Sequence, residues 1–139
     1  MSMKNWMMVL GLWAFGLQAA PDHVRVLREA AKQLRKTAPA DGDGATMDFV
    51  LAQKQATQAF EDAAYDARKA GKQEWFNAAF QFAAETLDLT PDVAFLAKKL
   101  YAKDQARGKF ALTSIRDPRK ADLLRGTMFA SDEAFNQEK

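Results

Sequence analysis

The segment from Glu74 to Leu89 (EWFNAAFQFAAETLDL) is the most apolar part of the predicted folded body. If this segment is helical, its large aromatic side chains point to more than one side and alanines fill the space between them. The aromatic residues are Trp75, Phe76, Phe80 and Phe82. A helix that is apolar over most of its circumference belongs inside a bundle, because a surface helix keeps one polar face. We therefore expect the neighbouring segments to cover this helix.

Two segments with helical periodicity precede the aromatic helix. The first begins at Pro21-Asp22, and its apolar residues recur every three or four positions. The second is capped by Thr46 or Asp48 and ends at Gly71. Its apolar seam consists mostly of alanine, which lets a neighbouring backbone approach closely and leaves room for aromatic side chains. The seam residues are Phe49, Ala52, Ala56, Ala59, Phe60, Ala63, Ala67 and Ala70.

The segments after the aromatic helix show a less regular pattern. Thr90 supplies a capping hydroxyl for a fourth helix that ends near Gly108, with proline and aspartate in its first turn. Residues 109–115 are expected to be extended or to form a ragged last turn. Two short helices follow, the first stopped by Gly126 and the second beginning at Ser131.

The first twenty residues have a different composition from the rest of the chain. A single lysine precedes the apolar run Trp6–Leu17, and small residues follow before the proline at position 21. This order is typical of a secretory signal peptide. The run is shorter than the roughly 20 residues that span a bilayer comfortably, although retention as a membrane anchor stays open. We expect the body to lie outside the cytoplasm, either free in the periplasm or anchored to the membrane by residues 6–20.

Length and composition limit the remaining possibilities. A chain of 139 residues provides for one folded domain. The absence of cysteine excludes disulfides, thiolate nucleophiles and iron–sulfur clusters. The formal net charge of +2 gives no indication of a nucleic-acid partner.

The prediction is an all-α fold: residues 1–19 are a signal peptide or anchor, and residues 20–139 form an antiparallel bundle of four main helices with short C-terminal helices.

A family resemblance covers part of this bundle. Gly71 lies at a turn between two helices that carry alanines at regular positions, and the sequence LDLTP ending at Pro91 matches the pattern Leu-x-Leu-x-Pro. The alanines are Ala67, Ala70, Ala79 and Ala83. On these residues, the run from Ala63 to Ala94 resembles a single degenerate tetratricopeptide-type helical hairpin. The resemblance implies two antiparallel helices that lead into a third at Pro91, and a role in protein–protein interaction.

Charge is distributed unevenly along the chain. From Lys98 to Arg125 there are nine cations and three carboxylates, whereas from Asp41 to Asp66 there are six carboxylates and one lysine. The first helix carries a second basic series, in which each cation comes one position after a residue of the apolar seam. These two basic series are the predicted contacts to a protein partner or to anionic lipid headgroups. The residues are Arg25, Arg28, Lys32, Arg35, Lys98, Lys99, Lys103 and Arg107.

Residues suited to catalysis or metal binding are few. His23 is the only histidine and is expected to be solvated in the first turn of its helix, so a zinc site with two or three histidines is excluded. A haem held by His23 and Met47 or Met128 is formally allowed, but nothing places these side chains opposite each other. The Asp41-Gly42-Asp43 run lacks the later oxygen ligands of a calcium loop. We predict no catalytic, metal or cofactor site.

Three functions remain from this reading. The leading one is a non-enzymatic exported or membrane-tethered module that docks on a larger protein, as an accessory subunit of a cell-envelope or membrane complex. The first alternative is a small cell-envelope hydrolase that uses Glu85 or Glu74 as its acid. The second alternative is a peripheral binder of anionic lipids through the basic series of the first helix.

Overall fold

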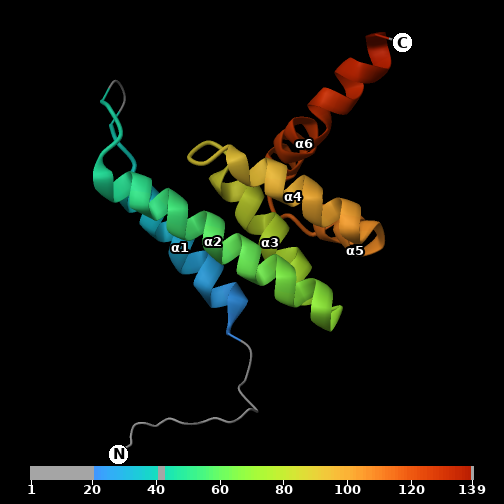
Figure 1. Cartoon of the computed structure of the whole chain (residues 1–139), viewed down its shortest axis with the longest axis horizontal. Coiled ribbons are helices and arrows are strands. Elements are labelled where there is room, and N and C mark those ends of the chain that lie inside the picture. Colours follow the sequence, from blue (N-terminus) through green and yellow to red (C-terminus); the bar gives the residue numbers. More distant parts are fainter. Residues whose placement is uncertain (1–20, 41–42, 139) are drawn as a thin grey trace, which may run out of the picture.

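The computed structural model describes residues 21–40 and 43–138. This part of the chain contains six helices and no strand, which confirms the all-α prediction (Figure 1). The predicted signal or anchor segment, residues 1–19, and the first two residues of the Asp-Gly-Asp run lie outside the described residues. The helices are α1 (His23–Thr37), α2 (Met47–Ala70), α3 (Gln73–Thr86), α4 (Asp92–Lys103), α5 (Gln105–Thr113) and α6 (Pro118–Glu138).

Short polar side chains and one glycine set the ends of the first two helices. Asp22 accepts a hydrogen bond from the backbone N–H of Arg25, and Thr46 accepts one from that of Phe49, each at 3.2 Å. The cap of α2 is therefore Thr46, one of the two predicted residues. Gly71 ends α2 in the left-handed conformation, with φ of 61°, which favours glycine.

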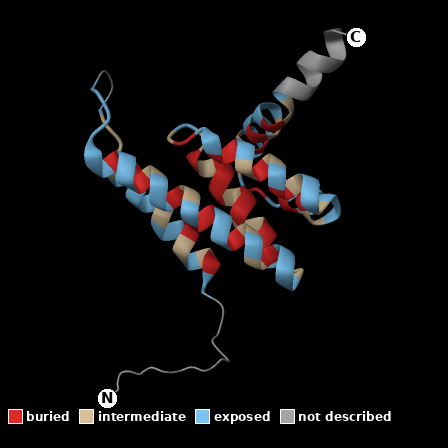
Figure 2. Ribbon diagram, in the orientation of Figure 1, coloured by how far each residue is buried: buried red, intermediate tan, exposed pale blue. Residues whose placement is uncertain are grey.

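The aromatic helix lies in the middle of the molecule, as predicted. Helix α3 packs against all five other helices, and its buried residues form much of the core (Figures 1 and 2). Phe76 and Phe80 have no exposed surface, and neither do Ala56 and Ala63 on the small-residue seam of α2. Helices α2 and α3 pack against each other, and the alanine seam of α2 and the aromatic residues of α3 are buried in one core.

The chain breaks its fourth helix earlier than predicted. Helix α4 ends at Lys103, and Asp104 caps α5 by accepting a hydrogen bond from the backbone N–H of Arg107 at 3.2 Å. Gly108 is buried inside α5 and does not end a helix. A Cβ at this position would lie 2.8 Å from Tyr101 Cδ2, so close packing requires the glycine. The prediction of an extended or ragged segment after residue 108 was therefore wrong.

Helix α6 is also longer than predicted. It runs through both Gly126 and Ser131, where the sequence predicted a stop and a new start. A glycine inside a helix costs only about 1 kcal/mol relative to alanine. Buried apolar residues on both sides of Gly126 offset this cost: Ala121, Leu124 and Met128 belong to the main core.

The expected cap of α4 is likewise different. Thr90 is buried, and the residue before the helix is Pro91, which makes no side-chain hydrogen bond to the first turn. The first turn of α4 is instead held by backbone bonds, in which Val93 and Ala94 donate to the carbonyl oxygens of Thr90 and Pro91 at 3.1 Å each.

Candidate functional site

The eight predicted contact residues do not form one surface. Three residues of α1, namely Arg28, Lys32 and Arg35, line a groove, and two residues of α4, Lys99 and Lys103, line a different one. The remaining residues lie outside these two grooves. They are Arg25, which is exposed on α1, Lys98, which is partly buried on α4, and Arg107, which is turned toward the α2–α3 connection.

The first groove is lined by residues of α1, the end of α3, the α3–α4 connection and α6, and has a volume of about 490 Å³. We call it the basic groove. Four of its lining residues are cations, two are carboxylates and the rest are apolar. The residues that define its chemistry are Arg28, Lys32, Arg35, Lys120, Leu87 and Leu123.

The carboxylates in the basic groove are already paired with arginines. Asp88 lies 3.9 Å from an Arg35 nitrogen, and the Arg35 guanidinium also donates to the backbone carbonyl of Glu85. The Glu85 carboxylate accepts a hydrogen bond from Gln81 at 2.9 Å and lies 3.5 Å from Arg116. These contacts reduce the negative potential inside the groove, so its cations dominate the local field.

Two of the cations make no ion pair within the described part of the chain. These are Arg28 on α1 and Lys120 on α6. Lys32 makes only an exposed pair with Glu29 at 3.8 Å, and such pairs contribute little stability. The groove therefore offers positive charge from two helices that are distant in sequence.

An exposed leucine adds an apolar contact to this charge. Leu123 on α6 is 64% exposed and lines the groove together with the partly buried Leu87. Helix α6 places Lys120 and Leu123 here because the neighbouring Ala121 and Leu124 pack into the core. Sequence reasoning missed both α6 residues, since nothing in the local pattern shows that α1 and α6 line the same groove.

The second candidate surface lies on α2 and α4. Two adjoining hollows of about 270 and 280 Å³ share the residues Tyr65, Arg68 and Lys103. Tyr65 is 58% exposed and Phe95 is 64% exposed. The Lys69 ammonium lies 5.3 Å from the Tyr65 ring centre, and that of Lys99 lies 5.1 Å from the Phe95 ring centre. We call this set the aromatic–basic surface: Tyr65, Arg68, Lys69, Phe95, Lys99 and Lys103.

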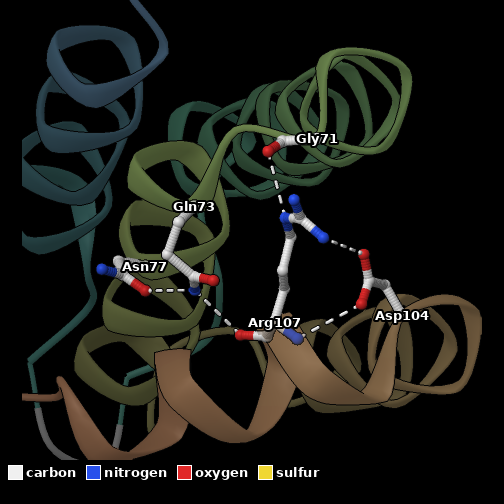
Figure 3. A network of polar contacts seen from close by, with 5 residues as sticks. All are labelled: Gly71, Gln73, Asn77, Asp104 and Arg107. Atoms are coloured by element: carbon white, nitrogen blue, oxygen red, sulfur yellow. Dashed lines mark hydrogen bonds and ion pairs between the residues drawn. The ribbon is translucent and has the colours of Figure 1, made fainter.

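Arg107 has internal partners (Figure 3). Its Nε donates to the Gly71 carbonyl at 3.0 Å, and its Nη1 donates to Asp104 at 3.2 Å. Its own carbonyl accepts from Gln73, whose amide also donates to Asn77, both at 2.9 Å. This network ties α5 to the connection between α2 and α3, so we assign Arg107 to the framework of the fold.

His23 is also part of the framework, which corrects the prediction of a solvated side chain. Only 2% of the residue is exposed. Its Nε2 lies 2.7 Å from an Asp66 carboxylate oxygen, and its ring meets Trp75 edge-on at 4.9 Å between centres. The contact joins the start of α1 to α2 and α3. Sequence reasoning missed it because both partners lie more than forty residues away.

The two glutamates considered as acids have different surroundings. Glu85 is bound by Gln81 and Arg116, as described above, and Glu74 is an exposed residue 3.8 Å from the Lys72 ammonium. In the described ranges, no cluster of three histidine, cysteine or acidic residues could hold a metal ion. The two positively charged surfaces are therefore the candidate sites that we consider further.

Comparison with protein-family models, with curated proteins and with solved structures finds no match to this chain. None of the helices within residues 21–40 and 43–138 has the length and apolar character needed to cross a membrane. The function is therefore argued from the chemistry of the two surfaces.

Proposed function

We propose that this protein is a non-enzymatic helical module that docks on a larger protein, as an accessory subunit of a cell-envelope or membrane complex. The observation that carries the proposal is the basic groove, which is lined by cations from α1 and α6 and by the exposed Leu123. In this proposal the four main helices act as an antiparallel bundle, and residues 63–94 serve as its tetratricopeptide-like interaction hairpin.

The groove indicates the chemistry of the partner. The cations of the groove attract carboxylates on a partner; they include Arg28, Lys32 and Lys120. The exposed Leu123 favours an apolar side chain placed between those carboxylates. An acidic amphipathic helix meets both needs, because it carries charge and an apolar stripe at helical spacing. The proposed partner segment is therefore an acidic amphipathic helix of another protein.

The proposed compartment rests on the pattern of the N-terminal residues. An apolar run behind a single lysine and ahead of small residues directs a protein to export. The body is then either released into the periplasm or tethered by residues 6–20. In both cases the partner segment lies outside the cytoplasm.

Site-specific photocrosslinking from Leu123 tests the docking proposal. A photoreactive amino acid at this position in the full chain, produced in its native host, should yield one discrete crosslinked protein. Charge reversal by Arg28→Glu with Lys120→Glu should reduce that product at least tenfold, because two cations become repulsive toward an acidic segment.

Two controls make this outcome decisive. The same photoreactive residue at Lys54, which is exposed on α2 and lines neither surface, should give no discrete product. The substitution Lys54→Glu with crosslinking from Leu123 should leave the product unchanged. A product that survives reversal of Arg28 and Lys120 would contradict the proposal, as would a crosslinked protein without an acidic segment at the crosslink.

A further inference from the structure

We propose that the aromatic–basic surface on α2 and α4 binds an anionic lipid surface. This surface shares no residue with the basic groove, so the proposal goes beyond partner docking. It also moves the predicted lipid contact from α1 to α2 and α4. Of the predicted contact residues, it includes Lys99 and Lys103.

The charge of the surface fits an anionic membrane. Its hollows are lined by cations from two helices, and their carboxylates are Glu61 and Asp104. Asp104 is held by the Arg107 guanidinium at 3.2 Å, which offsets its charge. Cations near a membrane surface are attracted by anionic headgroups, and their contributions add when several lie on one face.

The two exposed aromatic rings supply the second requirement of an interfacial site. Tyrosine and other aromatic side chains concentrate at the boundary between headgroups and acyl chains, where one end of the ring is apolar and the other is wet. Tyr65 and Phe95 each have a lysine ammonium near the ring. A ring can enter the interface while its lysine extends to a headgroup phosphate, because lysine has a long flexible stem.

The ring contacts also favour lipid over nucleic acid. A single-stranded nucleic acid binds such a surface by stacking its bases on open aromatic faces. Here the faces of Tyr65 and Phe95 are approached by Lys69 and Lys99 at 5.3 and 5.1 Å, so a stacking base would have to displace an ammonium group. The phosphate of a lipid headgroup can instead pair with the ammonium group where it lies.

The position of the surface agrees with the course of the chain. The contact between His23 and Asp66 places the beginning of α1 beside the C-terminal part of α2. Tyr65 is adjacent to Asp66 in sequence and Lys69 lies one turn further on. The beginning of α1 therefore lies near the end of α2 that carries Tyr65 and Lys69.

Vesicle partition of the full chain tests this inference. Binding is compared between vesicles of phosphatidylcholine alone and vesicles that also contain phosphatidylglycerol. The ratio of the two partition coefficients isolates the anionic contribution from any insertion by residues 1–20. Lys99→Glu with Lys103→Glu should lower this ratio by roughly tenfold or more, and added salt should lower it for the unchanged protein. Tyr65→Ser with Phe95→Ser should weaken binding to both vesicle types.

Helix α5 offers a matched control with the same chemistry outside the surface. Lys109 is exposed and Phe110 is 57% exposed. The double variant Lys109→Glu with Phe110→Ser should bind vesicles like the unchanged protein, and circular dichroism should show that all variants keep their helix content.

A ratio near one for the unchanged protein would overturn the inference, and so would equal losses in the α4 and α5 variants. Binding of single-stranded DNA in preference to phosphatidylglycerol vesicles would assign the surface to nucleic acid instead.

Discussion

At the scale of single residues, two polar side chains that local sequence places on the surface hold the fold together. His23 joins the first turn of α1 to Asp66 on α2, and its ring packs edge-on against Trp75 of α3. Arg107 ties α5 to the α2–α3 connection through the Gly71 carbonyl. Such buried or partly buried polar contacts contribute modest net stability when made, and they are costly to remove from one side only.

The substitution His23→Ala should therefore destabilise the protein. It opens a cavity beside Trp75 and removes the hydrogen-bond partner of Asp66, so we expect a loss of about 2–3 kcal/mol in the free energy of unfolding. Urea denaturation followed by circular dichroism measures this loss. Arg25→Ala, an exposed change in the same part of α1, should stay within about 0.5 kcal/mol of the unchanged protein. Equal effects of both changes would show that His23 has no packing role.

At the scale of elements, the helix boundaries depend on whether a glycine is required by its neighbours. Gly108 and Gly126 both lie inside helices, although the sequence predicts a helix end at each. A Cβ on Gly108 would press on Tyr101, whereas one on Gly126 would meet no atom within 4 Å. The same residue type therefore has a packing role in α5 and none in α6.

These two glycines predict opposite effects for the same substitution. Gly108→Ala should lower the free energy of unfolding by about 1–3 kcal/mol, because the added methyl group overpacks against Tyr101. Gly126→Ala should raise it by about 0.5–1 kcal/mol, because alanine favours the helix and restricts the unfolded chain. Thermal and urea denaturation of the two variants in parallel provide the measurement. Destabilisation by Gly126→Ala would mean that α6 is not a continuous helix at this position.

At the scale of the whole molecule, the fold separates the two basic series of the sequence. Part of the series on α1 joins Lys120 in the basic groove, and part of the series on α4 joins Tyr65 and Arg68 on the aromatic–basic surface. The two surfaces have no lining residue in common. In our two proposals, the protein partner and the anionic bilayer therefore occupy different surfaces of one molecule.

This separation predicts independent binding. Arg28→Glu with Lys120→Glu should abolish crosslinking from Leu123 and leave the anionic dependence of vesicle partition within about twofold, because distant sites act additively. Lys99→Glu with Lys103→Glu should have the reverse effect. Crosslinking and vesicle partition are measured on each double variant and on the variant that combines all four substitutions, which gives a complete mutant cycle. A single variant that abolishes both properties while preserving helix content would show that the two surfaces act as one.

Parts of this architecture could be predicted from local residues. The all-α class follows from apolar spacing, and the ends of α2 follow from Thr46 and Gly71, whose preferences act within a few residues. The central position of α3 follows from Glu74–Leu89, since a helix with apolar residues on most sides must be covered. The two basic series were also evident, although the surfaces that they form were not.

Local patterns in the sequence predict the helical class, the aromatic core helix, the beginning of α1 and both ends of α2, because each depends on spacing or on contacts within one turn. Packing between helices places His23 in the core and Gly108 inside α5, and it brings Lys120 and Leu123 of α6 into one groove with basic residues of α1. These features need partners from other helices, whose positions are set by packing the whole core. The candidate binding surfaces belong to this second group, since each combines side chains from helices far apart in the chain.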